Sequence, residues 1–220
     1  MIKAAIFDVD GTLVDSNDLH AEAWDETLRH FGKEIPYRDL REQIGKGGDQ
    51  YLPEFLSARE MREIGEDAVK FRADLFKRKY LGRVRPFPQV KELFERLRAD
   101  RKRIALASSG NADEAEHHVK LARLEGLVET QTSKSDVKHS KPSPDVFTSA
   151  LNLLHLQADE AIVIGDTPYD VQAAKKIGLC TVALLCGGFS EDQLRASGAI
   201  AIYDDPADVL ASYARSPLSR

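Results

Sequence analysis

Short hydrophobic runs alternate with amphipathic segments along most of the chain. The runs with the length and composition of buried β-strands lie at residues 2–7, 103–107, 161–164, 181–185 and 199–203, with a weaker candidate at 127–130. Segments with helical periodicity separate these runs, at residues 89–99, 113–124, 144–154, 169–177 and 191–196. Strands that are hydrophobic throughout are typical of a parallel sheet covered by helices on both faces. The pattern therefore predicts an α/β fold with a doubly wound, Rossmann-like parallel sheet.

One region interrupts this alternation. Residues 16–80 contain helix-like segments at 19–31 and 58–79 and a glycine-rich break at 45–48, but no strand pattern. Residues 83–88 (RVRPFP) read as a linker back to the sheet, because two prolines resist helix formation. We therefore predict a catalytic core formed by residues 1–15 and 81–220, with an all-helical domain, residues 16–80, inserted after the first strand.

Composition and charge narrow the functional classes. The chain of 220 residues is 42% hydrophobic and carries a formal net charge of -5. Proteins that bind nucleic acids or anionic membranes without sequence specificity usually carry a net positive charge, so this class is disfavoured. Cys180 and Cys186 form no metal motif and read as buried, reduced thiols. The first hydrophobic run meets Asp8 at once, and residues 179–186 are far shorter than the ~20 residues of a membrane span. We expect a cytoplasmic monomer or weak homodimer without nucleic-acid or membrane partners.

Polar residues follow three of the predicted strands. Asp8 and Asp10 follow the first strand, Ser108 and Ser109 follow the strand RIALA, and Asp166 follows the strand AIVIG. In an open parallel sheet, ligands bind at the carboxyl ends of the strands. The sequence therefore predicts an active site where these three strand ends meet.

The acids of this edge require a cation. Asp8, Asp10, Asp166 and Asp170 would bring several like charges together, which raises their pKa values unless a cation binds. Mg²⁺ fits, because it takes a few carboxylates together with water and a phosphate oxygen. The structural alternative is that Asp8 and Asp10 only shape a turn before Gly11.

Two further segments suit a phosphate group. Ser108 to Asn111 place hydroxyls and free amides at the start of a helix, although the same residues also serve as helix N-caps. Lys141 precedes a helix start at Ser143 and Pro144, and a lysine held there can reach into a cleft of carboxylates. The alternative for Lys141 is an ordinary solvated loop lysine.

Together these segments resemble the haloacid dehalogenase-like hydrolase superfamily. DVDGT at 8–12, ASS at 107–109, KPSPDVF at 141–147 and GDTPYD at 165–170 match its four motifs in order. The resemblance covers nearly the whole chain, and the helical insertion is similar to the family's small C1-type cap. It implies a phosphatase that transfers the phosphoryl group of a small phosphorylated substrate to an aspartate.

The resemblance also implies roles for the acidic residues. Asp8 would be the nucleophile, and Asp10 would protonate the leaving group and then activate water. Mg²⁺ would be held by Asp8, the backbone carbonyl of Asp10 and Asp166, with Asp170 supporting the metal site. Dehalogenases of the superfamily lack the second aspartate, so the presence of Asp10 disfavours that activity.

For the phosphoryl group, the resemblance implies binding by Ser108, Ser109, Lys141 and Gly11. The physical chemistry agrees, because phosphoryl transfer depends mainly on alignment and charge neutralisation.

Substrate selection is expected from the inserted helices. His20 and Trp24 lie four residues apart on one helix face, and Lys46 and Asn111 are further candidates for substrate contact. The structural alternative is that Trp24 belongs to the core of the inserted helices and that His20 is a polar helix residue with a partner inside the protein. His117 and His118 read as helix surface.

The alternatives remain open at this point. His20 and Trp24 match β-phosphoglucomutases, but the cap arginine of those enzymes has no clear counterpart, and Gly165 stands where they carry glutamate. We therefore expect a phosphatase, similar to phosphoglycolate phosphatase, and keep a mutase as the second hypothesis. A phosphonate hydrolase and a non-catalytic binding module fit the sequence less well.

Overall fold

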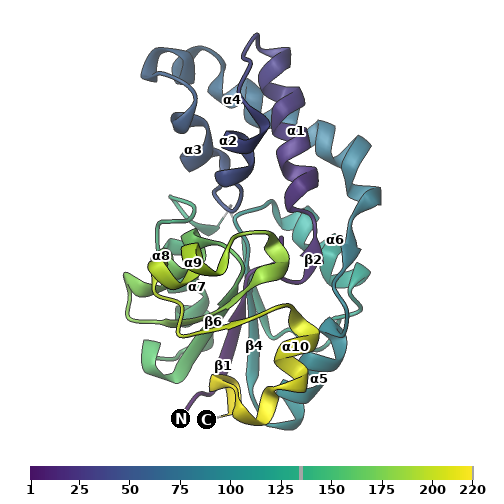
Figure 1. The fold of residues 1–220 in the computed structure, drawn as a ribbon, viewed down its shortest axis with the longest axis vertical. Helices are drawn as coiled ribbons and strands as arrows, with labels where there is room; N and C mark the ends of the chain where they lie inside the picture. The colour runs from purple at the N-terminus through teal and green to yellow at the C-terminus, as the bar shows by residue number, and fades with distance from the viewer. Residues whose placement is uncertain (134–135, 220) are drawn as a thin grey trace.

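The computed structural model describes residues 1–133 and 136–219 and shows a six-stranded parallel sheet (Figure 1). Its spatial order is β5-β4-β1-β6-β7-β8. The strands are β1 (Ala4–Phe7), β4 (Arg103–Ala107), β5 (Thr130–Thr132), β6 (Ala161–Gly165), β7 (Cys180–Leu184) and β8 (Ala201–Tyr203). This arrangement confirms the predicted α/β fold.

Both faces of the sheet are buried, which explains the continuous hydrophobic runs. Ala5 and Phe7 of β1 point to one face, where they pack with helices α5 (Val90–Ala99) and α10 (Pro206–Ala211). Ala4 and Ile6 point to the opposite face, covered by the helices α7 (Asp145–Leu154) and α8 (Pro168–Lys175). Since successive side chains alternate across a strand, a strand buried on both faces has no polar positions until it ends.

Four helices of the inserted region lie beyond the carboxyl ends of the strands (Figure 1). They are α1 (Asn17–His30), α2 (Tyr37–Glu42), α3 (Gly48–Tyr51) and α4 (Ala58–Leu75). These helices share a hydrophobic cluster of their own, which includes Trp24, Leu28, Leu40 and Tyr51. The helical segment is therefore packed internally while it faces the edge of the sheet where the polar residues emerge.

Several local predictions differ from the structure. The predicted linker contains β3 (Arg85–Pro86), which pairs antiparallel with β2 (Val14–Asp15), and a pair this short shows no alternation. The weak strand begins at Thr130 rather than at residue 127. Helix α7 begins at Asp145, with Pro144 rather than Ser143 as its N-cap. Helix α10 was not predicted. Two further helices, α6 (Ala112–Leu121) and α9 (Glu191–Ser197), were predicted with slightly different bounds.

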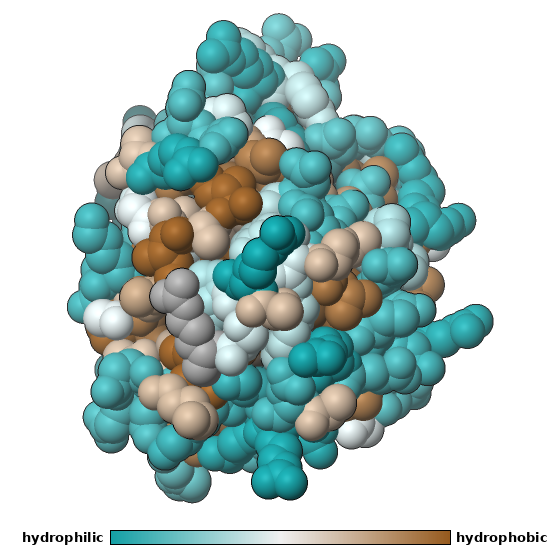
Figure 2. All heavy atoms as spheres, turned by 60° about the horizontal axis from the view of Figure 1, so that its bottom comes forward, coloured by the Kyte–Doolittle hydropathy of each residue, from teal (hydrophilic) through white to brown (hydrophobic). Residues whose placement is uncertain are grey.

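The surface is largely hydrophilic where Figure 2 shows it. The hydrophobic residues on that face form small patches separated by hydrophilic side chains, which is ordinary for a protein surface. Cys180 is exposed, contrary to the prediction that both cysteines are buried, and Cys186 is half-buried. Within the described residues, no helix combines the length and the hydrophobicity that crossing a membrane requires.

Candidate active site

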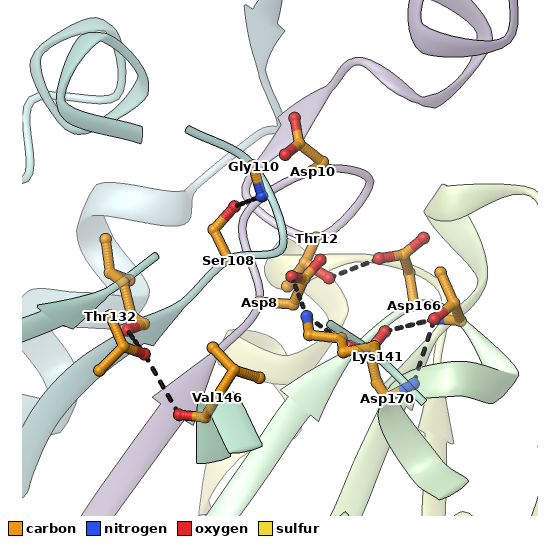
Figure 3. A network of polar contacts seen from close by, with 12 residues as sticks. Asp8, Asp10, Thr12, Ser108, Gly110, Thr132, Lys141, Val146, Asp166 and Asp170 are labelled. Atoms are coloured by element: carbon orange, nitrogen blue, oxygen red, sulfur yellow. Dashed lines mark hydrogen bonds and ion pairs between the residues drawn. The ribbon is translucent and has the colours of Figure 1, made fainter. Parts of the chain in front are cut away.

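Three carboxylates and one ammonium group meet at the carboxyl edge of the sheet (Figure 3). One oxygen each of Asp8, Asp166 and Asp170 lies within 4.8 Å of the others, and all three side chains are buried. Lys141, which is only 1% exposed, contacts Asp8 Oδ1, and its Nζ lies 2.7 Å from Asp170 Oδ1. The structure thus brings together four of the residues that the sequence singled out.

Asp166 is oriented by neighbours from the first strand end and helix α1. Thr12 Oγ1 donates to Asp166 Oδ1 at 2.7 Å, and Asn17 Nδ2 donates to Asp166 Oδ2 at 2.8 Å. A Cβ on Gly11, whose φ is +76°, would lie 2.3 Å from Asp166 Oδ2, and one on Gly187 would lie 1.8 Å from it. Gly11 therefore supplies both a left-handed turn and the close approach that a side chain would block.

Asp170 is positioned by the start of helix α8. Thr167 caps this helix: its Oγ1 accepts from the Asp170 backbone N–H, while Asp170 Oδ2 accepts from Thr167 N at 3.0 Å and Thr167 Oγ1 at 2.6 Å. Pro168 occupies the first helical turn, where its missing N–H costs nothing. This capping box leaves the other carboxylate oxygen of Asp170 for Lys141.

Burial dominates the electrostatics of this cluster. It raises the pKa of Asp8 well above its usual range, with only partial opposition from Lys141, and it raises the pKa of Asp166 to about 7, with help from the Asp170 charge. Burial alone would lower the pKa of Lys141, but the Asp170 and Asp8 carboxylates raise it above normal, so the ammonium persists. When fully ionised, the cluster carries two uncompensated negative charges. A divalent cation with oxygen ligands fits this donor set, and Mg²⁺ is the expected ion.

These pKa shifts predict an unusual pH dependence of stability without metal. The folded protein protonates Asp166 near pH 7, whereas the unfolded chain does so near the ordinary pKa of about 4. Between these values the folded state holds more protons, so lowering the pH from 7.5 to 5.5 in EDTA should raise the free energy of unfolding by up to about 1.4 kcal/mol per pH unit. Urea denaturation at several pH values measures this slope, and Asp166→Asn should reduce it, while the raised pKa of Asp8 retains part of it. A free energy of unfolding that decreases as the pH is lowered from 7.5 to 5.5, or a slope that is the same in both proteins, would contradict the assignment.

Asp10 lies apart from the three clustered carboxylates, beside Gly110 (Figure 3). Its Oδ1 accepts from Ser16 Oγ at 2.7 Å and from His20 Nε2 at 2.8 Å. Burial alone would raise the pKa of Asp10, but the charge and hydrogen bond of His20 lower it below its usual range, with help from His118 and Ser16. The contacts therefore favour the carboxylate form of Asp10.

The loop after β4 presents Ser109, Gly110 and Asn111 to the cavity beside Asp8 and Asp10. Ser108 Oγ accepts from the backbone N–H of Gly110 at 2.9 Å and so shapes this loop. Ser109 Oγ is buried without a hydrogen-bond partner among the described residues, which leaves it available to an anion. The predicted serine segment thus contributes a loop-forming hydroxyl and an unpaired one.

The helical segment closes over the opposite side of this cavity, which has a volume of about 80 Å³. His20, Trp24 and Lys46, three of the candidates for substrate contact, line this cavity, but each also has a partner within the protein. Trp24 stacks on Tyr51 with ring centroids 4.7 Å apart, and Lys46 Nζ donates to Glu54 Oε1 at 2.6 Å. The cavity wall and the helical core therefore share these residues.

Sequence reasoning missed Asn17, Arg72 and Glu114, and it placed His118 wrongly on the helix surface. His118 is 2% exposed, and its Nδ1 lies 3.9 Å from Asp10 Oδ1, whereas His117 is exposed as predicted. Arg72 contacts His20 Nδ1, and its Nη1 lies 3.7 Å from Glu114 Oε1. Only the four-residue spacing of Glu114 and His118 on α6 could have indicated a shared inward face.

Two phosphatases are similar to this chain in sequence. The chain is 30% identical over 180 residues to a phosphorylated carbohydrates phosphatase of Thermotoga maritima, covering 81% of this chain and 82% of that protein. It is 27% identical over 191 residues to a phosphoglycolate phosphatase of Aquifex aeolicus, covering 84% and 86% of the two chains.

A solved hydrolase from Pseudomonas syringae superposes with a TM-score of 0.88 at 29% identity, covering 96% of this chain and 98% of that one. The sequence model of the haloacid dehalogenase-like hydrolases matches residues 5–184. These matches confirm the resemblance carried by the four motifs, and the chain belongs to the haloacid dehalogenase-like hydrolase family.

Proposed function

We propose that this chain is a Mg²⁺-dependent phosphatase that hydrolyses a small organic phosphate monoester through an aspartyl-phosphate at Asp8. The observation that carries the proposal is the contact of Lys141 with Asp8 in a buried cluster that also contains Asp166 and Asp170. A nucleophilic carboxylate needs a cation beside it to approach an anionic phosphate, and this cluster provides one ammonium and a set of metal ligands. Residues 16–80 would act as the cap that excludes water.

The steps follow from the positions of the two aspartates. A carboxylate oxygen of Asp8 attacks phosphorus, the bond from phosphorus to the ester oxygen breaks, and Asp10 gives a proton to the leaving oxygen. Asp10, now ionised, accepts a proton from the water that attacks the phosphorus of the aspartyl-phosphate, which releases phosphate and restores Asp8. The hydrogen bonds from His20 and Ser16 favour the ionised Asp10 that this second step requires. The negative charge of a bound phosphoryl group would raise the pKa of Asp10 and so favour the protonated form that the first step requires.

The metal site would be formed by Asp8 and Asp166, with the backbone carbonyl of Asp10 and with Asp170 nearby. When bound, Mg²⁺ supplies positive charge to the phosphoryl oxygens. Lys141 adds a second positive charge, and the loop after β4 offers Ser109 Oγ and backbone amides to the same oxygens. Thr12 and Asn17 hold the Asp166 carboxylate in one orientation.

Phosphate release from a panel of esters tests this function. We expect turnover of at least one sugar phosphate or of phosphoglycolate with Mg²⁺ and loss of turnover in EDTA, with nucleotides as the bulky comparison. The relatives that act on phosphorylated carbohydrates and on phosphoglycolate support this choice of esters. If no ester is hydrolysed under either condition, the proposed function is wrong.

A β-phosphoglucomutase is the second candidate, because His20 lies 2.8 Å from Asp10 and Trp24 lines the cavity. A solved putative β-phosphoglucomutase from Thermotoga maritima is 26% identical, with a TM-score of 0.71. Incubation with β-glucose 1-phosphate and a catalytic sugar bisphosphate separates the two candidates. Glucose 6-phosphate as the main product would favour the mutase, and free phosphate would favour the phosphatase.

A further inference from the structure

A second carboxylate, that of Glu114, faces the space in which a leaving group would lie. The role inferred for Glu114 rests on the proposed phosphatase function. A Cβ placed on Gly110 would lie 3.6 Å from Asp10 Oδ2 and 3.7 Å from Glu114 Oε2. Asp10 and Glu114 therefore flank the same small space beside the predicted phosphate loop, where Figure 3 shows Asp10 next to Gly110. Glu114 lies in the first turn of α6, near Asp10 but outside the proposed metal cluster.

Glu114 is buried and incompletely paired. Its side chain lines the cavity, the residue is 7% exposed, and Oε2 has no hydrogen-bond partner among the described residues. Its other oxygen, Oε1, lies 3.7 Å from Arg72 Nη1. The two side chains therefore form an ion pair, but the distance is too long for a hydrogen bond. A buried carboxylate oxygen without a donor is costly, so a ligand that supplies a donor at this position would be favoured.

Both long cationic side chains that line the cavity are already paired with groups of the protein. Lys46 binds Glu54 and Gln43, and Arg72 lies beside Glu114 and contacts His20. Arg72 Nε is itself buried without a hydrogen-bond partner in the described part of the chain. Arg72 Nε–H and Glu114 Oε2 are thus one unpaired donor and one unpaired acceptor on two side chains that form an ion pair through their other atoms.

We propose that Glu114 is a specificity-determining residue that accepts a hydrogen bond from a hydroxyl of the leaving group, with Arg72 donating to a hydroxyl oxygen at the same position. A hydroxyl satisfies both groups, whereas a carboxylate or second phosphate satisfies Arg72 only and meets the like charge of Glu114. The enzyme would then select esters of uncharged, hydroxylated carbon chains and discriminate against phosphoglycolate-like esters and bisphosphates.

Part of the remaining cavity wall is apolar. Trp24 and Val69 supply a surface for a carbon skeleton. A short polyol or a small sugar combines such a skeleton with the hydroxyl groups that Arg72 and Glu114 would bind.

Three phosphate esters of similar size test the selection in the wild-type enzyme. We expect kcat/KM for glycerol 1-phosphate to exceed that for 3-phosphoglycerate, which carries a carboxylate, and that for propyl phosphate, which lacks hydroxyls, by at least about tenfold. Equal or better hydrolysis of 3-phosphoglycerate would overturn the inference but leave the phosphatase intact. Failure to hydrolyse any ester tested would overturn the proposed function and the inference with it.

Glu114→Gln tests the residue itself, and Glu116→Gln is the matched control. Glu116 lies on the same helix but is exposed and pairs with Lys120 on the surface. We expect Glu114→Gln to reduce the preference for glycerol 1-phosphate over 3-phosphoglycerate by about tenfold or more, and Glu116→Gln to leave it unchanged. The ratio is measured on one preparation, so a loss of folded protein cancels. A ratio that Glu114→Gln leaves at the wild-type value would overturn the assignment.

Discussion

Replacing Asp8 by asparagine should reduce phosphate release by at least about 10⁴-fold, because it replaces the carboxylate that attacks phosphorus in the proposed mechanism by an amide. Asparagine keeps the shape of the side chain but is a far weaker nucleophile than a carboxylate. Steady-state phosphate release with Mg²⁺, from the ester that the wild-type enzyme hydrolyses best, measures the loss.

The same substitution should not destabilise the metal-free protein. Burial and the Asp170 and Asp166 charges raise the pKa of Asp8, so its ionised form costs folding free energy at neutral pH. Removing that charge should leave the melting temperature in EDTA unchanged or higher, while stabilisation by Mg²⁺ decreases. Inactivity with intact stability separates a chemical role from a structural one.

Asp15→Asn is the matched control for this experiment. Asp15 belongs to the same segment but is exposed and lies in the short strand β2. We expect nearly wild-type turnover from this variant. An Asp8→Asn enzyme that retains more than about one tenth of wild-type turnover would exclude Asp8 as the nucleophile.

The sequence was sufficient to predict the sheet and the edge at which its polar residues meet, for a clear physical reason. Strands buried on both faces must be hydrophobic throughout, so Asp8 and Asp166 stand out where β1 and β6 end. Parallel strands bring their carboxyl ends to one edge, so topology alone placed these residues near one another. The capping box of helix α8, in which Thr167 pairs with Asp170, follows from local backbone requirements.

The residues that line the rest of the cavity could not be predicted in the same way. Arg72 lies in the 18-residue helix α4 among many exposed charged residues, and nothing local distinguishes it from them. His118 was predicted on the helix surface, and Glu114 was not singled out, because charged and polar helix positions are usually solvated. Their burial results from the docking of α4 and α1 over α6, which brings Arg72 beside Glu114 and His20 near His118. Such contacts between distant segments leave no periodic signal in the chain.

The second large effect is expected at Lys141, where Lys141→Met should lower the free energy of unfolding in EDTA by about 3–5 kcal/mol at neutral pH. The ammonium is 1% exposed and lies between Asp8 and Asp170. Methionine retains most of the side-chain volume, but it leaves three buried carboxylates without a compensating cation. Urea denaturation measures the loss, and turnover should fall as well because the phosphoryl group loses a positive charge.

Three comparisons distinguish lost charge balance from lost packing. Lys91→Met removes a surface ion pair with Glu95, in which the two side chains are 47% and 51% exposed, and should cost no more than about 0.5 kcal/mol. Mg²⁺ should recover part of the stability that Lys141→Met loses, because the cation supplies the missing charge. Adding Asp170→Asn to Lys141→Met should also recover stability, because it removes one of the uncompensated carboxylates. If Lys141→Met instead matches Lys91→Met in EDTA, the buried cluster does not depend on the ammonium, and the electrostatic basis of the proposed site is wrong.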